Sequence, residues 1–81
     1  MNLLNLTTTA ANLAADTVDA PFQPNNTVLA LSAAGVTLED SDDNVTYADF
    51  VVLAAGVFSK VTIEKQYLRV KTSGTAQLIG N

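Results

Sequence analysis

The absence of both cysteine and histidine from 81 residues most constrains what this chain can fold into. A domain of this size buries only about 60% of the surface that its unfolded chain exposes, so it is marginally stable alone. Small domains commonly compensate with disulfides, a structural metal or partner subunits. This chain has no disulfides and lacks the commonest soft metal ligands. We therefore predict a homo-oligomer.

The apolar content is high enough for a folded domain but offers little bulk. Hydrophobic residues make up 48% of the chain, whereas aromatic residues make up 6%. This composition predicts one domain with a thin core that gains stability by burial against a neighbour. The longest apolar run, residues 50–58, is far shorter than the roughly 20 residues that span a bilayer. We expect no membrane partner.

Charge is distributed unevenly along the chain. Residues 1–59 carry a net charge of −7, whereas residues 60–81 carry +3 because all four cations lie there. These halves could meet between subunits. Pairing within one fold, or simple solvation, is the favoured interpretation because surface ion pairs contribute little stability. An acidic chain with four scattered cations also makes nucleic acid a poor partner.

Residues 1–26 differ from the rest of the chain. Four apolar residues recur at helical spacing: Leu3, Leu6, Ala10 and Leu13. Three consecutive threonines oppose a helix because they are β-branched, so a short helix over about residues 9–16 and an extended arm are both open. The prolines and asparagines of residues 19–26 cannot continue a helix or a central strand. This segment is therefore expected to be a linker or a corner. We expect an N-terminal arm that ends in this Pro-containing linker, followed by a β domain over residues 27–81.

From residue 27 onward the sequence is typical of β-strands. Short segments that alternate apolar and polar residues are separated by turn residues. The expected strands cover residues 28–32, 36–39, 45–53, 57–65, 67–71 and 75–79. Gly-containing turns and the lack of βαβ alternation predict a mostly β fold, a small antiparallel β-sandwich or β-barrel of about six strands.

The last two expected strands predict a specific hairpin. A three-residue loop ending at Gly74 would put this glycine at the left-handed position that favours glycine. It would pair Val70 with Ala76 and Leu68 with Leu78 on one face. A two-residue turn would instead set polar residues opposite apolar ones. We predict the three-residue loop, since a one-residue slip moves every side chain to the other face.

Catalysis has little support in the sequence. Without histidine and cysteine, the remaining nucleophilic pair is Ser59 with Lys60. These neighbours would point to opposite faces of a strand. We therefore expect no catalytic residues, no enzyme activity and no cofactor.

The acidic segment Asp40–Asn44 has the first three ligand spacings of a calcium loop. The full pattern also needs glycine at its sixth position and glutamate at its twelfth, where this chain has Val45 and Val51. An acidic solvated turn is therefore favoured over a metal site. A weak cation site shared between subunits stays open.

Three features of the C-terminal half resemble a family: the Leu-Ala-Ala-Gly turn at residues 53–56, the alternating strand at residues 57–63, and the closing segment at residues 67–76. Together they resemble small structural proteins of tailed bacteriophages, of the capsid decoration or cement type. The resemblance implies a β-sandwich or β-barrel module, often a homotrimer with an extended arm. It also implies that the chain binds the major capsid protein on the outer capsid lattice and stabilises the head. The location would be the virion, after assembly in the host cytoplasm.

The stretch at residues 50–58 is either a buried strand and turn or an apolar patch that a neighbouring subunit covers. The interface candidates are Leu3, Leu6, Phe22, Phe50, Val52, Phe58 and Arg69. Two alternative functions remain: a neck, tail or fibre-attachment component of a virion, and a small ligand-binding β module. The absence of tryptophan leaves the second with a meagre aromatic platform for sugar stacking.

Overall fold

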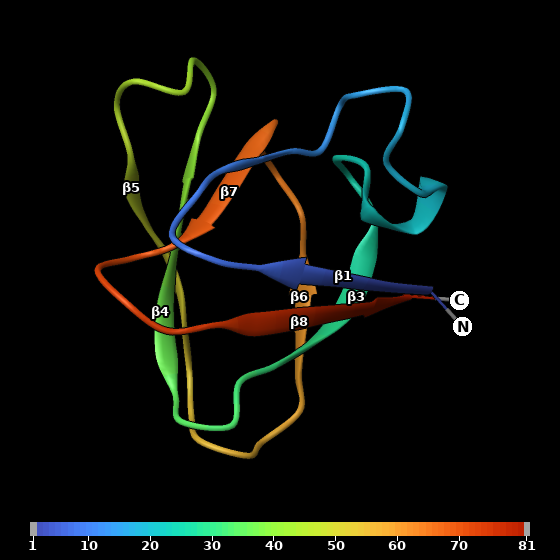
Figure 1. The fold of residues 1–81 in the computed structure, drawn as a ribbon. Coiled ribbons are helices and arrows are strands. Elements are labelled where there is room, and N and C mark those ends of the chain that lie inside the picture. Colours follow the sequence, from blue (N-terminus) through green and yellow to red (C-terminus); the bar gives the residue numbers. More distant parts are fainter. Residues whose placement is uncertain (1, 81) are drawn as a thin grey trace.

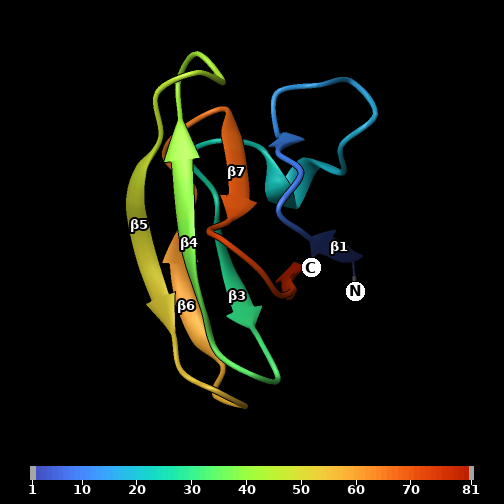
Figure 2. The same ribbon diagram turned by 60° about the vertical axis from the view of Figure 1, so that its left-hand side comes forward.

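The computed structural model describes residues 2–80, which form two four-stranded antiparallel sheets packed as a sandwich (Figures 1 and 2). Sheet A has the strand order β1-β8-β3-β6, and sheet B has the order β2-β7-β4-β5. The elements are β1 (Asn2–Leu6), β2 (Ala11–Asn12), the 3-10 turn η1 (Ala20–Phe22), β3 (Thr27–Leu31), β4 (Val36–Ser41), β5 (Ala48–Leu53), β6 (Ser59–Thr62), β7 (Tyr67–Val70) and β8 (Ala76–Gly80). The expected small antiparallel sandwich is confirmed, with eight described strands in place of about six.

The chain changes sheet at nearly every connection. Among the described strands, only β4 and β5 are consecutive in sequence and paired with each other. Every other connection crosses from one layer to the other. A strand with one apolar face must bury that face against a second layer. Crossing the gap at each loop lets strands that follow each other in sequence face the same core from opposite sides.

One hydrophobic core lies between the sheets. It contains the buried side chains of Leu6, Leu13, Phe22, Val28, Ala30, Leu38, Leu53, Val61, Ile63, Leu68, Val70, Ala76 and Leu78. Burial alternates along the strands, most clearly in β3, where Val28 and Ala30 are buried and Leu29 is exposed. This period of two is the pleat of a strand with one face toward the core. The outward residues of both sheets are therefore the ones available for function.

The expected helix over residues 9–16 and the expected arm are corrected by the structure. β1 pairs with β8 along its whole length, and β2 pairs with β7. Leu6 and Leu13 lie in the core at 1% and 0% exposure. The helical spacing of these leucines therefore has a different origin: the first ends a strand of sheet A and the second follows a strand of sheet B.

The Pro-containing segment also packs against the sandwich. Pro21 is the middle residue of the turn η1, whose last residue, Phe22, is buried. It lies so close to β8 that a Cβ atom added at Gly80 would be 2.5 Å from the Pro21 Cβ. Residues 2–26 and the later strands thus share one core, and residues 19–26 form a corner of the fold, one of the two expected alternatives, and not a linker.

The predicted β7–β8 hairpin is wrong. β7 pairs with β2 and β4, whereas β8 pairs with β1 and β3, so residues 71–75 form an arch between the sheets. Leu68, Val70, Ala76 and Leu78 are all buried, as the facial pattern required. They enter the core from opposite layers, because an arch satisfies the same inward pattern as a hairpin. Gly74 does adopt a positive φ, of 106°.

We expect Leu13→Ala to lower the free energy of unfolding by about 2–5 kcal/mol, since it removes a fully buried side chain. The control is Val45→Ala, at a side chain that is 81% exposed, for which we expect a change within about 0.5 kcal/mol. Urea unfolding of both variants measures the difference. Equal, small effects would mean that the N-terminal segment is detached from the core.

A pair of glycines tests the arch. Gly74→Ala should lower the free energy of unfolding by about 2–5 kcal/mol, because a left-handed residue costs about 1–2 kcal/mol and a forced contact costs about 1–3 kcal/mol more. The new Cβ would lie 2.9 Å from Val36 Cγ1. Gly56→Ala should cost only about 1–2 kcal/mol, since Gly56 has a φ of 70° but no atom within 4 Å of its added Cβ. Equal losses in urea unfolding would rule out close packing of the arch on β4.

Candidate functional site

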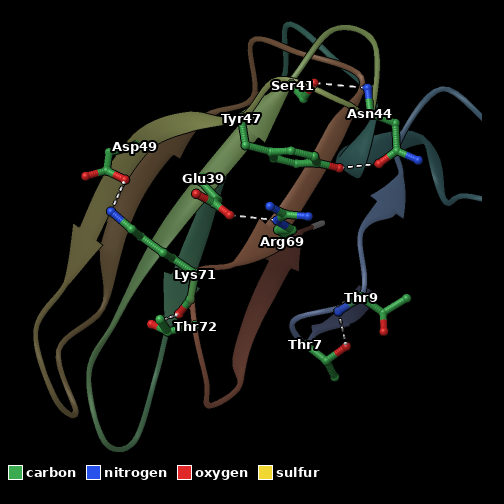
Figure 3. A network of polar contacts seen from close by, with 10 residues as sticks. All are labelled: Thr7, Thr9, Glu39, Ser41, Asn44, Tyr47, Asp49, Arg69, Lys71 and Thr72. Carbon is green, nitrogen blue, oxygen red and sulfur yellow. Dashed lines mark hydrogen bonds and ion pairs between the residues drawn. The ribbon is translucent and has the colours of Figure 1, made fainter.

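The outer face of sheet B carries a network of paired charges (Figure 3). The Arg69 Nε donates to Glu39 Oε1 at 2.7 Å, and this pair is in register between β7 and β4. The Tyr47 ring covers the Arg69 guanidinium, with 3.5 Å between the guanidinium carbon and the ring centroid. Such a cation–π contact adds to the ion pair. The Arg69 head group is therefore engaged within the chain.

The remaining cations of sheet B and its loops also pair within the fold. Lys71 Nζ donates to Asp49 Oδ1 at 2.8 Å, and this hydrogen bond raises the pKa of Lys71. Lys65 Nζ lies 4.0 Å from carboxylate oxygens of both Asp40 and Asp42. Burial raises the pKa of Asp40, an effect that the Lys65 charge opposes. The basic and acidic halves of the sequence thus meet inside one subunit, as the favoured interpretation held.

The acidic loop is organised around its own backbone. Asp43 Oδ1 accepts hydrogen bonds from the Ser41 hydroxyl at 2.8 Å and from the amides of Val45 and Thr46, both at 2.9 Å. The Tyr47 hydroxyl donates to Asn44 Oδ1 (Figure 3). The hydrogen bonds that the Asp43 carboxylate accepts from nearby backbone amides make this loop an Asx-type turn. The described residues contain no group of three or more acidic, histidine or cysteine side chains placed to hold a metal.

Two further features of the sequence can be placed. Ser59 is half-buried and Lys60 is exposed on successive positions of β6, the alternation that argued against a catalytic pair. Within residues 2–80, no helix has the length and apolar character needed to cross a membrane.

The outer face of sheet A is chemically different from that of sheet B. Strand register places Leu3 beside Ile79, Ile79 beside Leu29, and Leu29 beside Lys60. Leu3 is 50% exposed and Leu29 is 38% exposed. Neighbours in such a row have side chains in contact across strands. Three strands therefore present a continuous apolar row to the surface.

A second line of apolar residues meets this row at Leu29. Leu31 is the next outward residue of β3 and is half-buried. Phe58 directly precedes Ser59, the residue of β6 that pairs with Ala30, and it is 58% exposed. We call Leu3, Leu29, Leu31, Phe58 and Ile79 the apolar patch.

A hollow of about 360 Å³ lies beside the apolar patch. It is lined by Asn5, Leu6, Thr7, Leu31, Ser32, Ala33, Thr75, Ala76 and Gln77. Its polar groups bond one another: Gln77 Nε2 donates to Asn5 Oδ1 at 3.1 Å, and the Ser32 hydroxyl donates to the Thr75 carbonyl at 2.7 Å. The lining is therefore uncharged, and it combines these bonded polar groups with the apolar side chains of Leu6, Leu31, Ala33 and Ala76.

The seven interface candidates from the sequence separate into three groups. Leu6 and Phe22 are core residues at 1% exposure, and Leu6 also lines the hollow. Phe50 is half-buried and packs against the core, and Arg69 is held as described above.

The other three candidates are exposed: Leu3, Val52 at 73%, and Phe58. Only Leu3 and Phe58 belong to the apolar patch, because Val52 lies on β5 beside Thr37 in sheet B.

Sequence reasoning missed Leu29, Leu31 and Ile79. The signal was present, since residues 28–31 and 78–79 are apolar on consecutive positions. Such a strand has apolar residues on both faces and is either central or covered by a partner. The strand register of sheet A was needed to tell which of these residues face the core and which face outward.

Comparisons with protein-family models, curated proteins and solved structures find no match to this chain. The function is therefore argued from the surface itself.

The acidic loop gives a pH prediction. The bonds from the Thr46 and Val45 amides and the Ser41 hydroxyl lower the pKa of Asp43 from 3.8 to about 2. A carboxyl with a lowered folded-state pKa stabilises the fold above its unfolded pKa, and this stability is lost as the pH falls toward 2. We expect Asp43→Asn to be less stable than the parent above pH 4 and equal to it near pH 2.

Urea unfolding at a series of pH values measures this difference, with Asp42→Asn as the neighbouring control. A stability deficit of Asp43→Asn that stays constant between pH 5 and pH 2 would contradict the role of its charge.

Proposed function

We propose that this chain is a non-enzymatic structural module that acts by binding other protein chains, as a homo-oligomeric virion protein of the capsid decoration type. The observation that carries the proposal is the apolar patch on sheet A. Exposed contiguous apolar surface in a small protein marks an interaction site. Cement proteins need such a surface and need no active site.

The character of the rest of the surface supports an assembly role. On sheet B the exposed charges are engaged with each other, as in the pairs of Arg69 with Glu39 and Lys71 with Asp49. The chain forms eight described strands around a single core without a disulfide. A compact module of this kind can be repeated on a lattice, where several weak contacts gain strength through effective concentration.

The capsid surface and the major capsid protein as partner rest on the sequence resemblance. Residues 67–76, quoted for that resemblance, form a strand and an arch and not a hairpin. The proposal therefore relies more on the surface than on this segment. The arm that the resemblance implies has no counterpart in residues 2–26, so binding is assigned to the folded surface.

A small ligand-binding module is the second candidate, because the hollow falls within the usual 300–1,000 Å³ range of ligand pockets. Its walls lack aromatic and charged side chains, which limits both sugar stacking and ionic recognition. Assembly is therefore preferred.

The test is to purify virus particles from the source organism on a density gradient and to count copies of this chain by quantitative mass spectrometry. Decoration predicts hundreds of copies per particle and labelling of the head by antibody in electron micrographs. Copies in the tens, located at the neck or tail, would move the function to the alternative virion role. Complete absence from particles would reject both virion roles.

A further inference from the structure

We propose that the outer face of sheet A is the surface through which one copy of this chain binds a neighbouring copy, with the apolar patch at its centre. This inference rests on the proposed function, because it identifies the self-association surface of the homo-oligomer. It is carried by the register, exposure and charge of that face.

Charge selects this face over the rest of the molecule. The chain has a net charge of −4, so two copies repel each other through most orientations. On strands of sheet A, the outward positions hold no carboxylate, and Lys60 is the one charge among them. Like charges placed opposite one another cost several kcal/mol at an interface. Two copies that meet through the described strands of sheet A bring no carboxylates together, and Lys60 is the only like charge that each strand face contributes.

The same charge distribution disfavours an anionic lipid surface as the occupant. A single lysine lies beside the apolar patch, whereas lipid-binding surfaces of this kind carry clusters of cations. The acidic side chains elsewhere on the chain would be repelled by anionic head groups. A second copy of the same chain needs no cluster of cations on the face that it contacts.

The area of the face fits a stable contact. A standard interface buries about 800 Å² on each partner, which is under a fifth of the 4581 Å² surface of the chain. The molecule has principal extents of 30 × 30 × 17 Å, so a broad face can supply this area. Apolar residues at the centre with a polar rim, here Asn5, Thr27, Lys60, Thr62 and Gln77, match the usual anatomy of an interface.

The face offers both an exposed aromatic side chain and a recess. Phe58 is 58% exposed, and the hollow that Leu31 helps to line has a volume of about 360 Å³. Aromatic anchors that fill pockets contribute most of the energy of many interfaces. The Phe58 ring of one copy enters the hollow of the next, where Leu31 and Ala76 line it and no charge has to be desolvated.

The test compares Phe58→Asp and Leu3→Asp with the control Val52→Asp, whose side chain is 73% exposed on sheet B. Circular dichroism and urea unfolding first establish that each variant is folded. Sedimentation velocity over a wide range of protein concentration then gives the oligomeric state. We expect an oligomer for the parent and for Val52→Asp. For each sheet A variant we expect a rise of about 30-fold or more in the dissociation constant, the effect of losing an interface hot spot.

A parent that is monomeric at every concentration would overturn the inference, as would sheet A variants that associate like the parent. Equal dissociation of Val52→Asp would show a general charge effect and would also overturn it. Binding of the monomeric parent to anionic vesicles, or of a small ligand in the hollow, would assign the face to another occupant. The particle count is independent: a chain that associates through sheet A but is absent from virions would reject only the virion role.

Discussion

Burial of apolar side chains between two small sheets is the constraint on which the rest of this structure depends. No strand is long and no disulfide exists, so stability comes from the inward faces of eight described strands and one 3-10 turn. The chain meets this requirement by crossing between layers at nearly every loop. Neighbouring segments in sequence therefore face each other through the core, and hydrogen-bonded partners come from distant parts of the chain. β1 and β8 are the extreme case.

The sequence predicted the fold class and most strand positions because the period-two pattern reports which side chains are buried. It could not predict the partner of each strand. Leu68, Val70, Ala76 and Leu78 satisfy a hairpin and an arch equally well, and only long-range pairing with β1 and β4 decides between them. The N-terminal leucines led to the wrong prediction of a helix for a related reason. Their spacing of three and four residues matches a helix, but Leu6 ends a strand of sheet A and Leu13 follows a strand of sheet B.

The two outer faces show how a small domain separates stability from recognition. On sheet B, the charged side chains are engaged by contacts within the chain: the Tyr47 ring covers the Arg69 guanidinium, and Arg69 forms an ion pair with Glu39. On sheet A, Leu3, Leu29 and Phe58 are left exposed without charged neighbours other than Lys60. The sequence identified Leu3 and Phe58 by their apolar character alone. It could not separate them from the buried Leu6 and Phe22, because composition does not say which side of the sheet a residue occupies.

The pairing of β1 with β8 also has a consequence for synthesis. During translation the first strand leaves the ribosome long before its partner, so Leu4 and Leu6 have no sheet to join until β8 has emerged. Contacts this distant in sequence slow folding, since a large loop must close before they form. An apolar strand therefore remains unpaired in the nascent chain until residues 76–80 have been made. Chaperones that shield residues 2–6 during this interval would change the yield of folded protein without altering its final stability.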